Sequence, residues 1–510
     1  MTVASLLAVF GAWFGFANPI YQLPILVLLL PAGLTAAAVR CPTVGKAART
    51  GLWIGAASAL GTLYWTALPV HDYGNVVWPL ALPIPVLLSL VLGGYTAAYA
   101  ALVRFAHPKL SPWLFGPLAG VAFGSMELAR GMLFTGFPWL ALPSALAPWP
   151  ATIQGAAFLG AYGLSGLFAC LVAWIGVSGP LSKQGLVAIV AGAALFIGGN
   201  MRLSSPPDRD GTVHVTIVQG NVDQSRKWDP AAQSETVDNY LDLTRGALKD
   251  APTDLVVWPE TAMPFYFQNP GEFSARLRSF VDGTGIPLLF GAPAYGRLPD
   301  NTPVMYNRAY LVQPHRAQAD YYDKEHLVPF GEYVPLGKLL SFVNKLVAGV
   351  GDFRPGKEQQ PLRDGRLALG VLICYEAIFP ELAQQRVEAG ANLLINISND
   401  AWFGDSPAPR QHLDLAVLRA VEQGRAIIRS TNTGISAAID PRGRIMAQGG
   451  LFTTLTLPCP ETPLVSETTW FHRHFALVTW GMPVLLAILL LWSVIAPPRL
   501  QNAPSRGQTL

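Results

Sequence analysis

Eight apolar segments constrain this chain more than any other feature of its sequence. A helix needs about 20 mostly apolar residues to cross a bilayer. Segments that reach or approach this length lie at residues 4–18, 21–39, 51–69, 78–103, 112–134, 152–179, 185–201 and 475–496. They predict a membrane α-helical bundle of about eight transmembrane helices, with a soluble domain inserted before the last one. Pro19 and Pro24 lie between the first two segments, where a re-entrant hairpin is the alternative.

Charged residues are concentrated in one part of the chain. They make up only 13% of the sequence, against about 25% in soluble proteins. Residues 201–473 contain 26 of the 35 basic residues and 30 of the 32 acidic residues. We therefore predict a membrane domain with seven helices at 1–205, an extracytoplasmic domain at 206–470, and a final helix with a short cytoplasmic tail at 471–510. The net charge of only +3, from scattered basic residues, excludes a nucleic-acid binder.

The basic residues of the short loops predict the orientation of the chain. Loops rich in Lys and Arg stay in the cytoplasm. With eight crossings, the basic loops and the C-terminal tail fall on one side, and they contain Arg40, Lys46, Arg49, Arg104, Lys109, Lys183, Arg499 and Arg506. The loop at 70–77 has no Lys or Arg and falls on the other side together with the large domain. The large domain should then face the periplasm or the cell exterior. The first segment has no Lys or Arg before it, so we interpret it as a retained helix rather than a cleaved signal.

Between 211 and 460 the pattern changes to short β-branched runs that alternate with amphipathic segments, which is typical of a layered α/β domain. Strands are expected at 214–219, 254–258, 287–290, 307–312, 367–373, 392–397, 427–430 and 434–439, and helices at 231–249, 271–283, 380–389 and 411–424. Residues 341–362 show no clear periodicity, and loops of this length are often functional. We hypothesise that this loop acts as a lid.

Three reactive residue types occur at or near the ends of predicted strands in this domain. Glu260 ends LVVWPE, Cys374 follows GVLI, and Lys324 lies in YYDKEHLVPFGEY. A thiol of ordinary pKa about 8.5 forms a thiolate more readily near a cation such as Lys324, which would also stabilise an oxyanion. Glu260 would act as general base. The ordinary alternative is a buried structural cysteine with a solvated acid and lysine.

The order of these motifs resembles the nitrilase, or carbon-nitrogen hydrolase, family, whose members carry a Glu-Lys-Cys triad on an αββα sandwich. Together with the hydrophobic part, the whole chain is similar to the apolipoprotein N-acyltransferase family, which completes bacterial lipoprotein maturation. The supporting strings are QGNVDQSRKW (219–228), HLVPFGEYVPL (326–336), SNDAWFGDS (398–406), RSTNTGIS (429–436) and FTGFPWL (134–140).

The resemblance implies a ping-pong reaction in the bacterial inner membrane, with the catalytic domain facing the periplasm. Cys374 would take the sn-1 acyl chain of a phospholipid such as phosphatidylethanolamine as a thioester. The N-terminal amine of a diacylglyceryl-cysteine lipoprotein, the diacylated apolipoprotein acceptor, would then receive it. No cofactor is implied. The cysteines, at 41, 170, 374 and 459, have no metal-site spacing, so no metal is expected.

Auxiliary roles also follow from the resemblance. Glu332 and Glu376 would position Lys324 and support the intermediate, although each is equally consistent with a surface acid. Tyr375 would shape the pocket, with core packing as its alternative.

Three further residues are candidates for substrate binding. Trp228 and Phe403 would contact acyl chains, or simply pack. Asn399, with Asp400, would brace the site, although a turn-forming role is equally consistent.

Other residues carry smaller expectations. Glu127 and Arg130 lie one helical step apart, and we favour an ion pair between them over contact of Arg130 with lipid phosphate. We expect no disulfide between Cys374 and Cys459. Two rival functions are a membrane-anchored amidase of the same triad and a transporter whose external domain binds ligand without chemistry. The transporter is disfavoured because the predicted spans hold almost no ionisable groups.

Overall fold

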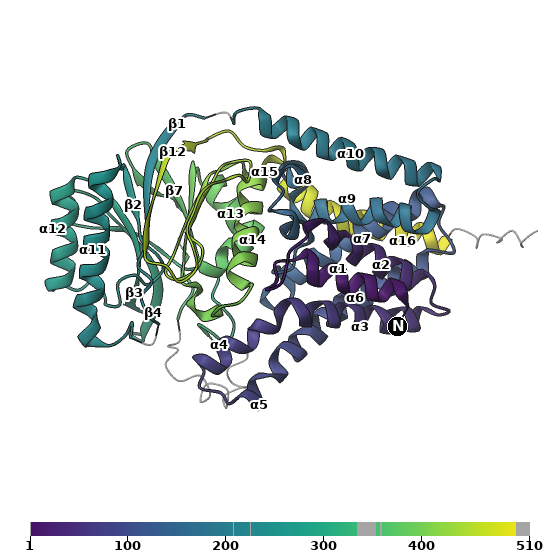
Figure 1. Ribbon diagram of the computed structural model, residues 1–510, viewed down its shortest axis with the longest axis horizontal. Coiled ribbons are helices and arrows are strands. Elements are labelled where there is room, and N and C mark those ends of the chain that lie inside the picture. Colours follow the sequence, from purple (N-terminus) through teal and green to yellow (C-terminus); the bar gives the residue numbers. More distant parts are fainter. Residues whose placement is uncertain (1, 208, 225, 334–352, 358–359, 496–510) are drawn as a thin grey trace, which may run out of the picture.

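The computed structural model describes residues 2–207, 209–224, 226–333, 353–357 and 360–495. A helical body and a layered α/β domain lie side by side along the long axis of the molecule (Figure 1). Most of the loop predicted at 341–362 lies outside the described residues, so the lid hypothesis is not tested.

All eight segments predicted to cross the membrane contain helix. The main helices are α1 (Val3–Gly15), α2 (Leu29–Val39), α3 (Val44–Leu63), α6 (Pro83–Ala106), α7 (Pro112–Met132), α9 (Ala156–Ser178), α10 (Lys183–Ser204) and α16 (Phe475–Ile495). Four helical stretches in the described part of the chain are long and apolar enough to cross a membrane, namely Trp78–Ala106, α9, α10 and α16. The number of eight crossings therefore stays a prediction.

Small residues allow the helices of the body to pack closely. A Cβ atom at Gly120 of α7 would lie 2.6 Å from the carbonyl oxygen of Gly166 in α9. One at Gly51 of α3 would lie 2.5 Å from the oxygen of Thr96 in α6. Neither approach leaves room for a side chain, and close backbone packing of this kind holds helices together where lipid offers no hydrophobic driving force.

The α/β domain contains two six-stranded sheets of similar design. The first has the order β12-β1-β2-β3-β4-β5 and the second β11-β10-β9-β8-β7-β6. Parallel strands form the centre of each sheet and antiparallel strands the edges. The strands are β1 (Gly211–Gln219), β2 (Leu255–Val257), β3 (Leu288–Arg297), β4 (Pro303–Val312), β5 (Asp320–Asp323), β6 (Leu362–Asp364), β7 (Leu367–Ile373), β8 (Leu393–Ser398), β9 (Ile427–Thr431), β10 (Ala437–Ile439), β11 (Ile445–Gln448) and β12 (Leu455–Leu464).

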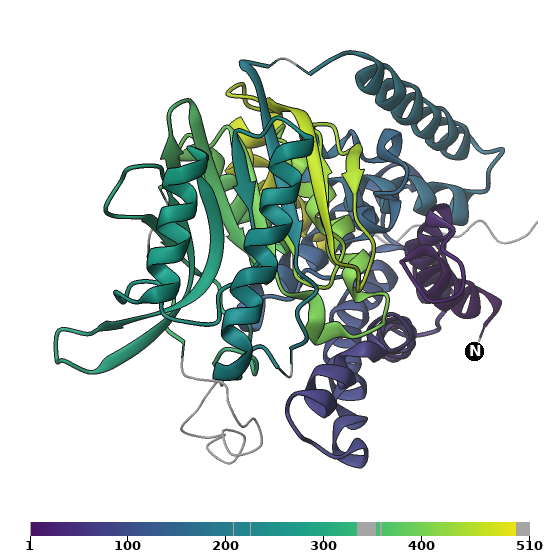
Figure 2. The same ribbon diagram turned by 60° about the vertical axis from the view of Figure 1, so that its left-hand side comes forward.

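Helices cover the outer faces of the two sheets, so the predicted αββα sandwich is confirmed. One apolar core lies between the sheets, where Ile217 and Leu255 meet Leu369 and Ile395. The helices α11 (Gln233–Asp250) and α12 (Glu272–Thr284) pack on the first sheet, and Figure 2 shows them on the side away from the helical body.

The second sheet faces the helical body through α13 (Pro380–Glu388) and α14 (Ala408–Gln423). The core beneath these helices is continuous with that of the body, joining Leu372 and Leu413 to Trp139 and Leu164. The two parts are therefore packed against each other through a shared core.

Four strands were not expected from the sequence, namely β5, β6, β11 and β12. The ten-residue β12 contains Pro458, Pro460 and Pro463, which normally argue against a strand. It lies at the edge of the first sheet, paired only with β1. An edge strand tolerates proline because its outer amides need no partner in the sheet.

Candidate active site

The cysteine that follows β7 lies at the carboxyl end of a fully buried strand. Cys374 has a φ of 52°, in the left-handed region, and begins the short helix η7 (Cys374–Ile378). For a residue other than glycine this backbone conformation costs free energy. It persists where neighbouring groups fix it, and this occurs often at functional sites. Two groups fix the backbone here: His412 Nε2 lies 3.1 Å from the Cys374 carbonyl oxygen, and Asn396 Nδ2 donates to it at 3.4 Å.

The structure brings Glu260 and Lys324 together with this thiol. Glu260 follows β2 and Lys324 follows β5, so both come from the first sheet while Cys374 comes from the second. Lys324 Nζ lies 3.8 Å from Glu260 Oε1 and 2.9 Å from Glu332 Oε2. The charges of Glu260 and Lys324 both act on the pKa of the thiol. All three side chains are buried.

Burial controls the protonation of the cysteine. It raises the pKa of the Cys374 thiol well above its ordinary value, and the Glu260 carboxylate raises it further. Lys324 lowers this pKa, as expected from the sequence, but does not outweigh burial. At neutral pH the thiol is therefore protonated, and it would have to lose this proton before the sulfur could act as a nucleophile.

The pKa values of Glu260 and Lys324 are both raised, which suits proton transfer to Glu260 beside a fixed positive charge. Burial raises the pKa of Glu260, partly offset by Lys324, and makes its carboxylate a better base than an exposed one. Burial acts to lower the pKa of Lys324, but the carboxylates of Glu332 and Glu260 raise it above its ordinary value. Lys324 therefore keeps its positive charge.

Two asparagines hold the Glu260 carboxylate in place. Asn307 Nδ2 donates to Glu260 Oε1 at 2.7 Å and to Glu332 Oε1 at 2.8 Å. The backbone amide of Asn399 donates to Glu260 Oε2 at 2.9 Å. Asn307 was missed in the sequence analysis, where the only signal was a polar residue opening the apolar run NRAYLV.

The two auxiliary acids occupy different places. Glu332 contacts Lys324 directly, whereas Glu376 is fully buried and bonds to the Tyr322 hydroxyl and to backbone amides. Glu376 Oε1 accepts from the backbone amides of Glu325 and His326, at 2.7 and 3.0 Å. Glu376 therefore fixes the chain that follows Lys324, and neither acid is the free surface carboxylate of the alternative interpretation.

The three aromatic residues predicted at the site, Tyr375, Phe403 and Trp228, lie in different environments. Tyr375 is buried, and its hydroxyl donates to the Gly136 carbonyl at 3.1 Å, so it ties the nucleophile's neighbour to the helical body. Phe403 packs edge-on against Trp65 and Trp139, with centroid distances of 5.0 and 5.6 Å. Trp228 is 52% exposed, which is unusual for a tryptophan and leaves its ring free to contact a substrate.

The predicted ion pair inside the helical body is present. Arg130 Nη2 lies 3.5 Å from Glu127 Oε1 and donates to the Leu140 carbonyl at 2.7 Å. Glu127 also accepts from the Leu142 amide and the Ser165 hydroxyl. The pair thus fixes the turn at 136–142 that supports Tyr375.

Behind Cys374, a buried hydrogen-bond network stabilises its backbone. His412 Nδ1 lies 3.2 Å from Asp400 Oδ1, and Arg429 Nη2 donates to Asp400 Oδ2 at 2.6 Å. Arg429 and His412 outweigh the effect of burial and hold the pKa of Asp400 below its ordinary value. A charged Asp400 fixes the histidine that bonds to the Cys374 carbonyl.

A buried lysine beside Glu260 was also missed. Lys227 is 1% exposed, and its Nζ donates to the Glu260 carbonyl at 3.4 Å. Its position in the string QGNVDQSRKW was the only signal. Within the described ranges, no group of three or more His, Cys, Asp or Glu side chains is arranged to hold a metal ion. All four cysteines are free thiols, including Cys459.

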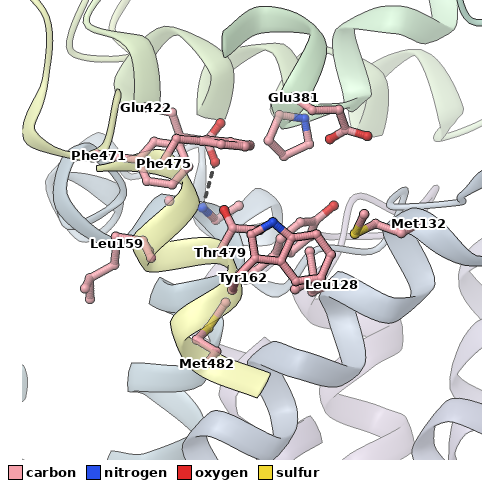
Figure 3. A pocket seen from close by; sticks show the side chains of 15 residues that line it. Leu128, Met132, Leu159, Tyr162, Glu381, Glu422, Phe471, Phe475, Thr479 and Met482 are labelled. Carbon is pink, nitrogen blue, oxygen red and sulfur yellow. Dashed lines mark hydrogen bonds between the residues drawn. The ribbon is translucent and has the colours of Figure 1, made fainter. Parts of the chain in front are cut away.

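A separate cavity lies where the helical body meets the α/β domain (Figure 3). It encloses about 90 Å³ and has a mostly apolar lining, with Leu128, Tyr162 and Met482 on one side and Glu381 and Glu422 on the other. Glu422 is not free, because it accepts from the Ala161 amide at 2.6 Å. None of the triad residues lines this cavity.

Two family profiles match the chain. The apolipoprotein N-acyltransferase N-terminal domain matches residues 10–199, and the carbon-nitrogen hydrolase family matches residues 214–458. Among solved structures, Nit3 of Saccharomyces cerevisiae, of the nitrilase superfamily, is 22% identical and covers 51% of this chain and 93% of its own, with a TM-score of 0.38.

Curated relatives match nearly the whole length of the chain. Apolipoprotein N-acyltransferase of Geobacter metallireducens is 38% identical over 447 residues, which cover 86% of this chain and 85% of the relative. The protein of the same name from Azotobacter vinelandii is 35% identical over 477 residues, covering 89% of each.

Proposed function

Because the chain belongs to the apolipoprotein N-acyltransferase family, we propose that Cys374 carries the acyl group between the two substrates. The single observation that supports this most is the buried cluster of Cys374, Glu260 and Lys324, assembled from strand ends of two sheets. Membership of this family makes the chain an acyltransferase of lipoprotein biosynthesis and a membrane protein.

In the first half-reaction, the Cys374 sulfur attacks the carbonyl carbon of the sn-1 ester of a phospholipid while Glu260 takes the thiol proton. The ester oxygen becomes negative in the tetrahedral intermediate, and Lys324 stabilises it. The intermediate then breaks its bond to the glycerol oxygen, which receives the proton from Glu260. A thioester on Cys374 and a lysophospholipid result.

In the second half-reaction, the N-terminal amine of a diacylglyceryl-cysteine lipoprotein attacks the thioester. Glu260 takes a proton from the amine, the carbon-sulfur bond breaks, and the sulfur regains a proton. The amide product is more stable than the thioester, so the transfer needs no nucleotide. Lys324 again stabilises the oxyanion, because its charge is fixed by Glu332 as well as Glu260.

The surroundings of the triad support lipid substrates held in a bilayer. The α/β domain, proposed at 206–470, shares a core with the membrane domain proposed at 1–205. Tyr375, next to the nucleophile, bonds to Gly136 in that body. Substrates anchored in the same membrane search a smaller space, which favours productive orientation. We place the enzyme in the bacterial inner membrane with this domain in the periplasm, and phosphatidylethanolamine as donor.

The experiment that tests this proposal is acyl trapping. Purified protein is incubated with phosphatidylethanolamine, and the Cys374 peptide is examined by mass spectrometry for the mass of a fatty acyl group. Cys374→Ala should abolish the adduct, whereas Cys459→Ala, which removes a buried thiol of the same domain outside the triad, should not. Ammonia release from small amides without any acyl adduct would favour the amidase instead and contradict the proposal.

A further inference from the structure

Lys227 is a buried cation with no charged partner other than the catalytic acid among the described residues. It lies in the segment after β1, its side chain is 1% exposed, and its Nζ donates to the Glu260 backbone carbonyl at 3.4 Å. Taking an ammonium group out of water is costly unless an opposite charge compensates. Burial lowers the pKa of Lys227 to about 8, and the charge of Glu260, alone among the described residues, opposes that effect.

The charges at the site balance only when Lys227 is included. The buried carboxylate of Glu260 and the largely covered carboxylate of Glu332, whose side chain is 13% exposed, share Lys324. Lys324 lies nearer to Glu332, at 2.9 Å, than to Glu260, at 3.8 Å. One ammonium between two carboxylates leaves an uncompensated negative charge in a buried site. Lys227 supplies the second positive charge, and it does so on the side of Glu260.

We propose that Lys227 is a positioning residue for the transfer reaction, whose ammonium group keeps Glu260 in the carboxylate form and fixes its backbone. This inference rests on the proposed role of Glu260 as general base. A base has to be deprotonated before the thiol attacks, and the charges that lower the pKa of Glu260 come from Lys324 and Lys227.

The other groups that face Glu260 also affect its pKa. Glu332 raises the pKa of Glu260, and the Asn307 side chain lowers it through its hydrogen bond. Cys374 is a neutral thiol in the resting state, as its raised pKa requires. Without the positive charge at 227, less positive charge opposes the effect of Glu332 on Glu260. The pKa of Glu260 should therefore rise.

The test is the pH profile of Cys374 acylation by phosphatidylethanolamine in detergent micelles, measured for the full-length protein. The acylation rate increases with pH as Glu260 loses its proton. In Lys227→Gln and Lys227→Met, two neutral variants, the midpoint of this acid limb should move up by about 1 pH unit, the size expected for loss of a nearby opposite charge. Lys227→Arg, which keeps the charge, should stay close to the wild-type midpoint. Lys249→Gln, an exposed lysine of α11, is the matched control and should match the wild type.

The outcomes separate this inference from the proposed function. Absence of an acyl adduct on Cys374 in the wild type would contradict both. A wild-type adduct together with unshifted acid limbs in the folded neutral variants would overturn the role of Lys227 alone. A slower rate at every pH with an unchanged midpoint would also overturn it, because a merely structural residue gives that result. An upward shift of the midpoint in either neutral variant, together with a wild-type midpoint in Lys227→Arg, supports the role of Lys227.

Discussion

At the scale of single residues, the site depends on a few hydrogen bonds that hold two carboxylates beside one lysine. Asn307 donates to both Glu260 and Glu332 with one amide nitrogen. Without it, the two acids would be held only by Lys324 and by backbone amides. The geometry of the proposed general base, Glu260, is therefore set by Asn307, a residue that takes no part in the proposed bond changes.

Asn307→Asp tests this arrangement with almost no change of shape. The variant loses the donor and adds a third acid, which raises the pKa of Glu260 by like-charge repulsion. Hydrogen bonds to charged groups contribute about 1.5–3 kcal/mol, so acylation of Cys374 at neutral pH should fall about 10-fold to 100-fold. The rate of thioester formation measures this. Asn301→Asp on an exposed turn is the control, and equal rates for the two variants would show that Asn307 does not hold the base.

The sequence pointed to the three residues that we propose as the triad, but not to the contacts that support them. Cys374, Lys324 and Glu260 occur in recognisable strings at strand ends. Asn307 and Lys227 contribute through partners 47 and 33 positions away in the chain. Only the pairing of strands brings such residues together. Similarly, the sequence predicted a cation beside the thiol, but the dominance of burial over that cation follows from the three-dimensional environment.

At the scale of elements, one amide side chain of α14 makes four of the hydrogen bonds that connect the α/β domain to the helical body. Gln411 is buried, and its oxygen accepts from the indoles of Trp65 and Trp139 at 3.2 and 2.8 Å. Its nitrogen donates to the carbonyls of Ala17 and Thr62 at 3.0 and 3.1 Å. Four groups from three segments of the body, at 17, 62–65 and 139, thus meet at one residue of α14.

Gln411→Leu should destabilise the junction of the two parts. The leucine leaves two indole N–H groups and two carbonyls without partners in a buried place, each costing about 1–3 kcal/mol unless it finds a new partner. We expect a loss of roughly 3 kcal/mol, allowing for partial relaxation, and a lower melting temperature in detergent micelles. Gln318→Leu, on an exposed loop of the same domain, should melt like the wild type. Identical melting of the two variants would contradict the role of Gln411.

Elements with clear periodicity were predicted well, and edge strands were not. All the predicted strands of the α/β domain are present, because the central parallel strands are buried on both faces and read as continuous apolar runs. The edge strands β5, β6, β11 and β12 have exposed positions and, in β12, prolines. Their formation depends on a neighbouring strand rather than on their own composition.

At the scale of the whole molecule, orientation in the membrane is the feature that the structure leaves to experiment. The distribution of Lys and Arg predicts the α/β domain in the periplasm and the short basic loops in the cytoplasm. In a Cys41→Ser background, Asp300→Cys introduces a thiol on the exposed surface of the domain, and Lys46→Cys introduces one on the exposed first turn of α3, at the predicted cytoplasmic end of that helix.

A membrane-impermeant maleimide added to spheroplasts should label the variant at 300 and leave the variant at 46 unlabelled until the membrane is permeabilised. The reverse pattern would contradict the predicted orientation. The remaining native thiols are buried, so the background variant alone is the control for their labelling.

The measurement that tests the central claim most directly is transfer of a trapped acyl group. Protein acylated with a radiolabelled fatty acid from phospholipid is separated from the donor and then mixed with a synthetic diacylated lipopeptide that has a free N-terminal amine. The label should leave the Cys374 peptide and appear in the lipopeptide as an amide, in equal amounts. Label that remains on the protein, or that appears as free fatty acid whether or not the lipopeptide is present, would contradict acyl transfer through Cys374.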